Sequence, residues 1–147
     1  MHRQWCAGKT TLLHLIAGVA TPQHGEVLID GTSPVSGKPS DMSRTFLIEE
    51  GMSLPGKTIR DFSHLHSHFY PNFSAEAFTA NLAAFRLSGD EVMKSQSLGN
   101  RKKAQLAYAL ALGVDVLLLD EPTNALDIES KATLTRLIAS NITEGRL

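Results

Sequence analysis

The sequence is poor in the features that mark secreted, membrane-spanning or nucleic-acid-binding proteins. It has one cysteine, Cys6, which excludes an intrachain disulfide and agrees with a reducing compartment. No apolar run approaches the ~18 residues that span a bilayer, and the start, MHRQWCAGKTT, lacks the apolar stretch of a signal peptide. The net charge of −1 gives no electrostatic reason to expect binding to nucleic acid or to an acidic membrane. We therefore expect a cytoplasmic protein without a nucleic-acid partner.

The remaining composition is that of one soluble globular domain. Hydrophobic residues make up 42% of the 147 residues and charged residues 20%, which is typical of this class. A chain of this length buries a sizeable core, so we expect a single domain over residues 1–147, with room for a lobe. The sequence contains no GxSxG nucleophile elbow and no cysteine-based metal cluster.

The most informative stretch is 117–127, LLLDEPTNALD. The nearly continuous apolar run at 114–119 is typical of a strand covered on both faces in a parallel sheet. In an open α/β sheet, ligands bind beyond the carboxyl ends of the strands, so Asp120 and Glu121 emerge where a ligand is expected. A carboxylate there can hold Mg²⁺, and its neighbour can orient or deprotonate a water. The plain alternative is a strand that ends in two acids before a turn.

A glycine turn leads into a helix at the other end of the chain, in AGKTTLLHLIAG at 7–18. Gly8, Lys9 and Thr10 form the second half of the phosphate-binding pattern GxxxxGK(S/T). In that pattern backbone N–H groups at a helix N-terminus close on phosphate oxygens, lysine reaches the terminal phosphates and the hydroxyl binds Mg²⁺. Gly18 is placed to end the helix. Its apolar face is expected at Leu12, Leu13, Leu15 and Ile16.

The middle of the chain predicts two short strands and a helical segment. Gly25–Gly31 is expected to form a strand closed by a turn at its last two residues, and a loop follows at 32–40. Arg44–Ile48 is expected to form a second strand that ends in Glu49. From Thr58 to about Met93 the pattern turns helical, with a break at Pro71, and indicates a separate lobe. Its apolar positions include Phe73, Phe78, Leu82 and Phe85.

Two further helices are expected. One opens at 97–100, SLGN, and runs to about Leu112 with Ala104, Ala107, Tyr108 and Leu110 facing inward. Cations at 101–103 in its first turn oppose the helix dipole. They form either a solvated basic patch or part of a phosphate-facing helix terminus to which Ser97 contributes. Asp127 is expected to cap the last helix, which ends at Gly145 and is marked by Ile128, Leu134, Leu137 and Ile138.

Three alternating histidines, His64, His66 and His68, could suggest a metal site. Their spacing would place them on one side of a strand but scatters them around a helix. Because the segment is predicted to be helical, we expect ordinary helix or surface histidines.

Taken in order, AGKTT, a carboxylate-tipped strand, a helical lobe, SLGNRKK, LLLDEP and NALD resemble the ATP-binding cassette of ABC transporters. The resemblance covers nearly the whole chain. It implies an α/β fold of the P-loop NTPase (RecA-like) type, in which helices flank a mainly parallel sheet. It also implies a helical subdomain inserted at about 57–113 and, for this chain, an incomplete sheet.

The resemblance also implies roles for individual residues. The Walker A motif is Gly8, Lys9, Thr10 and Thr11, preceded by Ala7, and Walker B is 117–120. ATP and Mg²⁺ are the implied cofactors, with Thr10 and Asp120 on the metal and Glu121 as the catalytic residue that polarises water. Glu49 stands where the family usually has a glutamine that senses Mg²⁺. The signature residues Ser97, Gly99 and Asn100 would contact ATP held by a second cassette, and the D-loop is 124–127.

The implied partners are a second cassette, packed head to tail, and a transmembrane permease, which would hold the chain at the inner face of the cell membrane. The stretch FYPNF at 69–73 is similar to cassettes of the bacterial drug- and antibiotic-export type. Arg3 and Cys6 depart from P-loop glycines, and the resemblance implies a cassette truncated at both ends. A non-transport ABC protein acting on ribosomes or DNA, and an inactive nucleotide-binding fragment, are the alternatives.

Overall fold

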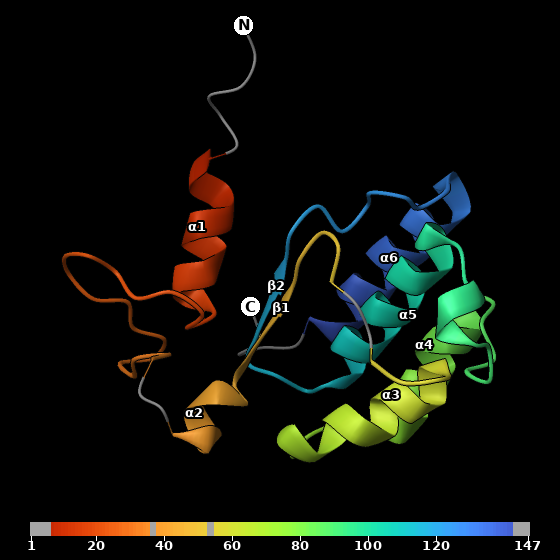
Figure 1. Cartoon of the computed structure of the whole chain (residues 1–147), viewed down its shortest axis with the longest axis horizontal. Helices are drawn as coiled ribbons and strands as arrows, with labels where there is room; N and C mark the ends of the chain where they lie inside the picture. Colours follow the sequence, from red (N-terminus) through yellow and green to blue (C-terminus); the bar gives the residue numbers. More distant parts are fainter. Residues whose placement is uncertain (1–6, 36–37, 53–54, 143–147) are drawn as a thin grey trace, which may run out of the picture.

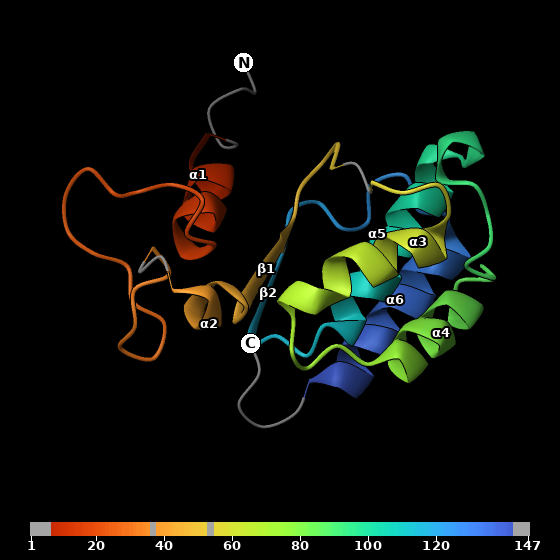
Figure 2. The ribbon, with the colours of Figure 1, turned by 60° about the horizontal axis from the view of Figure 1, so that its bottom comes forward.

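The computed structural model describes residues 7–35, 38–52 and 55–142. In chain order the elements are α1 (Ala7–Ile16), α2 (Pro39–Met42), β1 (Thr45–Ile48), α3 (Ile59–His66), η1 (Ser67–Phe69), α4 (Ala75–Ala84), η2 (Met93–Ser95), α5 (Leu98–Ala111), β2 (Val116–Leu119) and α6 (Ile128–Asn141). The two strands lie between α1 on one side and the layer α3–α6 on the other, as Figures 1 and 2 show. Within the described ranges, no helix has the length and apolar character needed to cross a membrane.

The two strands pair in parallel, as the sequence predicts. The ladder runs from Thr45 opposite Val116 to Ile48 opposite Leu119, so the carboxyl ends of both strands meet at one edge. The expectation that the second strand is covered on both faces is wrong, because all four residues of β2 keep intermediate exposure. In the described part of the chain β2 pairs only with β1, which leaves its other side partly open.

The strand expected at Gly25–Gly31 does not form. Ile29 makes only an isolated antiparallel bridge with Thr32, around a turn in which Asp30 and Gly31 have φ of 49° and 77°. A turn with two positive φ values is the predicted hairpin turn, but the described residues supply no ladder to extend it. Arg44 stabilises this turn: its Nη2 lies 2.7 Å from Asp30 Oδ2, and its Nε lies 2.5 Å from Asp115 Oδ2. These two hydrogen-bonded carboxylates raise the pKa of Arg44.

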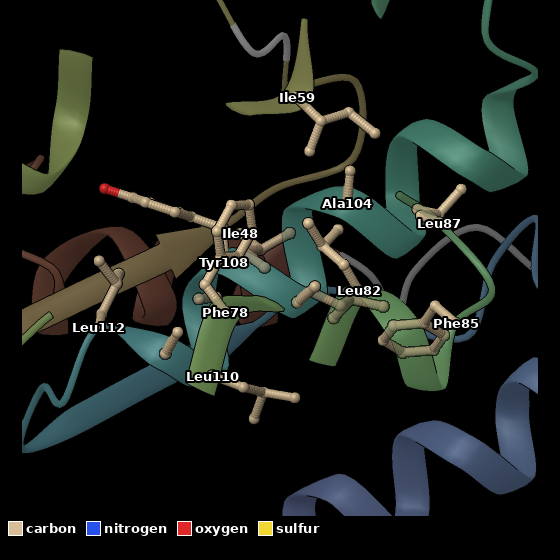
Figure 3. Packing of buried hydrophobic residues seen from close by; sticks show 14 of the residues in the cluster. Ile48, Ile59, Phe78, Leu82, Phe85, Leu87, Ala104, Tyr108, Leu110 and Leu112 are labelled. Carbon is tan, nitrogen blue, oxygen red and sulfur yellow. The ribbon is translucent and has the colours of Figure 1, made fainter. Parts of the chain in front are cut away.

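The hydrophobic core lies in the helical layer and against β1. Tyr108 of α5 is fully buried, and its ring packs at 4.6 Å from Phe62, 5.5 Å from Phe73 and 5.9 Å from Phe78. Figure 3 shows Tyr108 among Ile48, Phe78 and Leu82. The predicted inward residues of this helix are therefore confirmed: Ala104, Ala107, Tyr108 and Leu110 are all buried.

The N-terminus of α6 has the capping residue that the sequence predicts. Asp127 accepts a hydrogen bond from the Ser130 N–H at 2.8 Å and caps α6. Leu134 is buried, but the expectation for Ile128 is wrong, because Ile128 is 88% exposed. Helix residues share a face at spacings of three, four or seven, and Ile128 is six residues from Leu134. Helix α6 ends at Asn141, and Gly145 lies outside the described residues.

Candidate functional site

The two strands deliver carboxylates to the same edge of the sheet. Ile48 and Leu119 are the last paired residues, so Glu49 and Asp120 follow them side by side. The Asp120 N–H donates to the Ile48 carbonyl at 2.9 Å, which continues the ladder pattern and fixes the backbone of Asp120. Asp120 and Glu121 therefore follow the carboxyl end of this strand, as the sequence predicts.

Helix α1 brings Lys9 and Thr10 to these acids from the other end of the chain. The Thr10 hydroxyl donates to Asp120 Oδ2 at 3.3 Å. Lys9 Nζ lies 3.9 Å from Glu121 Oε1, near the outer limit of an ion pair, and both side chains are more than half exposed. The structure thus joins the half P-loop to the end of β2, across more than 100 residues of sequence. Gly8 and Thr11 lie exposed beside Lys9 and Thr10, and Ala7 is the first residue of α1.

Glu121 has a strained backbone. Its φ is +46°, in the left-handed region, which non-glycine residues rarely occupy outside turns and functional sites. The Asn124 N–H donates to the Glu121 carbonyl at 3.1 Å, so the chain turns sharply after Asp120. This turn keeps the Glu121 side chain exposed beside Lys9. The sequence analysis placed a turn after the two acids but did not predict this conformation.

Glu49 contacts a residue that the sequence analysis did not single out. Its Oε1 is hydrogen-bonded to Nε2 of His14 on α1. His14 lies four residues after Thr10, and side chains with this spacing lie on one face of a helix. One face of α1 therefore contacts the acids after both strands. The helical spacing could have indicated the face, but not its partner.

The predicted signature residues pack against the predicted D-loop. Ser97 caps α5 by accepting from the Asn100 N–H at 3.1 Å. A Cβ placed on Gly99 would lie 2.8 Å from the Ala125 carbonyl oxygen, so only glycine fits there. Ala125 itself has a positive φ of 64°. Ser97, Gly99 and Asn100 are thus held beside the 124–127 segment, which leads directly from Glu121.

The three cations of α5 do not form one solvated patch. Arg101 is exposed, but Lys102 is buried. Its burial lowers the pKa of Lys102, while the charges of Glu50, Asp120 and Glu121 act in the opposite direction. Lys103 lies 3.3 Å from Asp127.

The pKa of Asp127 is lowered to about 2. The largest cause is the hydrogen bond from the backbone N–H of Ser130. Smaller contributions come from the Ser130 hydroxyl and from Lys103. These interactions favour the charged carboxylate, so Asp127 keeps its negative charge at the N-terminus of α6.

A cavity of about 510 Å³ separates the segment after β1 from the start of α5. Its walls include Glu50, Gly56, Lys94, Leu98, Lys102 and Asn124. Leu98 of the predicted signature, Lys102 of α5 and Asn124 of the predicted D-loop therefore border one opening. The sequence analysis did not predict this cavity, which depends on how the segments pack.

The histidines behave as the helical pattern predicts. His66 stacks on Phe62 with ring centroids 4.7 Å apart, and His68 Nδ1 bonds to the His64 carbonyl at 2.8 Å. No group of three or more His, Cys, Asp or Glu side chains suited to a metal occurs in the part of the chain that the structure describes.

The donor set at the strand ends fits a magnesium nucleotide. Mg²⁺ prefers oxygen ligands and is usually held by one or two protein groups together with phosphates and waters. Thr10 and Asp120 supply a hydroxyl and a carboxylate already within hydrogen-bonding distance. Lys9 supplies a cation that a phosphate can reach from solvent, since its side chain is 67% exposed.

Known proteins share both the sequence pattern and the fold. Residues 6–124 match the ABC transporter family. YtlC of Bacillus subtilis (strain 168), an uncharacterized ABC transporter ATP-binding protein, is 32% identical over 142 residues, which cover 93% of this chain and 54% of YtlC. CcmA of Xanthomonas campestris pv. campestris (strain 8004), a cytochrome c biogenesis ATP-binding export protein, is 35% identical over 95% of this chain and 65% of its own length. A ribose import protein, RbsA of Cereibacter sphaeroides, also matches at 30% identity over 82% of this chain and 26% of its own length.

The solved structure of an ATP-binding subunit of an ABC transporter has the same fold. It superposes with a TM-score of 0.83 at 23% identity, over 95% of this chain and 61% of that one. The chain spans about half the length of the first curated relatives that it matches. The fold, the order of the motifs and the match over residues 6–124 lead to one conclusion: the chain belongs to the ABC transporter family and has a P-loop NTPase fold.

Proposed function

We propose that this chain is the ATP-binding and ATP-hydrolysing part of an ABC transporter. The observation that carries the proposal is the hydrogen bond from Thr10 to Asp120 at 3.3 Å. It joins the start of the helix that would receive phosphates to the strand end that would hold the metal. In this proposal, residues 1–147 are one cassette domain with a helical subdomain at about 57–113.

Each group at the strand ends has a proposed task. Lys9 and the N–H groups of Ala7, Gly8 and Thr11 bind the phosphates, because a helix N-terminus attracts anions. Thr10 and Asp120 hold Mg²⁺, which when bound neutralises charge on the phosphates. Glu121 orients the attacking water and accepts its proton. Phosphoryl transfer depends mainly on such positioning and charge neutralisation, so no covalent intermediate with the protein is needed.

The signature residues serve a second nucleotide. Ser97 is exposed at the N-terminus of α5, and with Gly99 and Asn100 it would contact ATP held by a second cassette. Two cassettes would then pack head to tail, with Asn124–Asp127 near the shared surface. Glu49 would lie beside the terminal phosphate of the chain's own nucleotide.

Transport requires a permease, to which the cassette would attach at the inner face of the membrane. ATP hydrolysis would separate the paired cassettes and drive the permease. We propose export, on the similarity of 69–73 to drug- and antibiotic-export cassettes, although matching relatives are named for import as well as export. The transported substrate is set by the permease.

The test is ATP turnover by this chain and by its Glu121→Gln variant, with Glu26→Gln as a matched control at an exposed carboxylate away from the site. Glu121→Gln should lower the turnover rate by about 100-fold or more, the range expected for loss of a general base. It should leave the binding of a fluorescent ATP analogue in place, and Glu26→Gln should match the unchanged chain. Equal background rates in all three proteins would overturn the claim that the chain hydrolyses ATP.

A further inference from the structure

Helix α1 touches the sheet edge through two polar side chains on one face. Thr10 donates to Asp120, which follows β2, and His14 is hydrogen-bonded to Glu49, which follows β1. Because β1 and β2 are paired up to Ile48 and Leu119, the two acids are neighbours. One turn of helix therefore spans both strand ends.

The pair of His14 and Glu49 is partly shielded from solvent. The side chain of His14 is 32% exposed and that of Glu49 is 43% exposed. Such a pair contributes little to stability on its own, because solvent screens it and two side chains must be ordered. Its importance therefore lies in where it holds the Glu49 carboxylate and not in its contribution to stability.

The charge at this edge explains why the position of Glu49 matters. Three carboxylates, those of Glu49, Asp120 and Glu121, end up near the place proposed for the terminal phosphates. Lys9 lies 3.9 Å from Glu121, and Thr10 bonds to Asp120. Glu49 has His14 as its partner. A carboxylate turned toward the phosphates without this partner would repel a nucleoside triphosphate more strongly than a diphosphate.

We propose that His14 is a positioning residue: its imidazole holds the Glu49 carboxylate at the end of β1 and so admits a terminal phosphate beside it. This inference rests on the proposed binding of ATP at the same site. It adds a role for a residue on α1 outside the phosphate-binding motif. This role predicts that changing His14 alters the preference for ATP over ADP, which a purely structural role would not do.

The experiment measures the affinities of fluorescent ATP and ADP analogues in Mg²⁺. The variants are His14→Leu, Glu49→Gln and the double variant, with His24→Leu as a matched control at an exposed histidine. His14→Leu should weaken ATP binding about fivefold more than ADP binding, the scale of one uncompensated charge near a phosphate at a partly exposed site. In the Glu49→Gln background the same change should alter the ATP-to-ADP ratio less than about twofold, because no charge remains to be held.

A second variant separates the loss of the contact from the loss of the fold. His14→Gln keeps a hydrogen-bond donor with similar reach and should restore most of the ATP preference. It also carries the test if His14→Leu does not fold, which thermal unfolding without nucleotide would show. His24→Leu should leave both affinities unchanged.

The outcomes distinguish this inference from the function on which it rests. If the unchanged chain binds neither analogue, the proposed function is overturned for this chain, and the role of His14 with it. If the unchanged chain binds both analogues and the His14 variants weaken both affinities by the same factor, only the proposed role of His14 is overturned. The same conclusion follows if His14→Leu has an equal effect with and without the Glu49 carboxylate.

Discussion

The two sides of the sheet are held in different ways. On one side, the helical layer buries Phe62, Leu106 and Tyr108 completely. On the other side, α1 leaves Leu12 55% exposed and reaches the sheet edge through polar contacts made by Thr10 and His14. Figure 2 shows α1 set apart from the tightly packed helices. The main packing and the proposed ligand site are therefore located on opposite sides of the same two strands.

This difference follows from the physical size of the interactions. Removing a buried aromatic side chain costs about 3–5 kcal/mol, whereas an exposed ion pair contributes about 0–1 kcal/mol. Segments that bind ligands are commonly among the less stable parts of a fold, because they must open or adjust. We expect α1 to loosen before the helical layer unfolds, and a bound nucleotide to stabilise α1 most.

The largest effect is expected at Tyr108. Tyr108→Ala removes a fully buried ring that contacts Phe46, Phe62, Phe73 and Phe78. It should lower the free energy of unfolding by about 3–5 kcal/mol, measured by urea denaturation followed by circular dichroism. A loss below about 1 kcal/mol would show that the helical layer does not carry the stability of the fold.

Tyr108→Phe is the matched control for this prediction. It deletes only the hydroxyl, which is buried without a hydrogen-bond partner among the described residues. Burial raises the pKa of Tyr108, so the hydroxyl stays neutral in the assay and the control measures packing alone. Since an unpaired buried hydroxyl is unfavourable, Tyr108→Phe should leave stability unchanged or raise it slightly.

Two glycine substitutions compare the two sides directly. At Gly99 on α5 a Cβ would come within 2.8 Å of the Ala125 carbonyl oxygen, whereas at Gly8 on α1 no other atom of the described residues lies within 4 Å. Gly99→Ala should destabilise the chain by about 1–3 kcal/mol through overpacking. Gly8→Ala should stabilise the nucleotide-free chain by about 0.4–1 kcal/mol, because alanine restricts the unfolded chain.

Gly8→Ala should weaken nucleotide binding although it stabilises the nucleotide-free chain. The added methyl group would occupy space where backbone N–H groups are proposed to close on phosphate. Urea denaturation and titration with a fluorescent ATP analogue together test this pair. Tighter nucleotide binding by Gly8→Ala, or a Gly99→Ala variant as stable as the unchanged chain, would contradict the proposed division of roles.

The sequence predicted those parts of the site that depend on local chemistry. Asp127 was recognised as a capping residue because capping uses a side chain and the N–H groups of the next turn. The meeting of Thr10 with Asp120 was implied by the family pattern. The cap needs only a short motif. The meeting of Thr10 with Asp120 needs, in addition, the rule that ligands lie at the carboxyl ends of parallel strands.

The parts that were missed depend on packing between distant segments. The partner of His14 is Glu49, and helical spacing cannot identify a partner on another element. Lys102 is buried although its neighbour Arg101 is exposed, because α5 enters the packed layer at this point and is covered on all sides from Ala104 to Ala111. The strand expected at Gly25–Gly31 fails because a strand requires a neighbour to pair with, and sequence alternation does not supply one.

The smallest effect is expected at Asp127, which caps α6. Its substitution tests whether the helix caps of the helical layer make the fold sensitive to acid. The pKa of Asp127 falls from 3.8 to about 2 on folding, so its contribution to stability is complete above about pH 4 and is lost as the pH falls toward 2. Asp127→Asn keeps a capping side chain without the charge. The thermal midpoints of the two proteins should differ by a few degrees near neutral pH and converge below pH 4.

Ser74→Ala supplies the matched control, because Ser74 caps α4 with a neutral hydroxyl that accepts from the Ala77 N–H at 3.0 Å. Its loss should lower the thermal midpoint by an amount that changes less with pH than the Asp127→Asn effect, because the hydroxyl carries no charge and its one contact with a carboxylate is its hydrogen bond to the exposed Glu76. A gap between Asp127→Asn and the unchanged chain that stays constant from pH 7 to pH 2 would exclude Asp127 as a source of acid sensitivity. Glu91 would then be the next carboxylate to test, because burial raises its pKa but hydrogen bonds from Ser88 and Gly89 lower it to below its ordinary value.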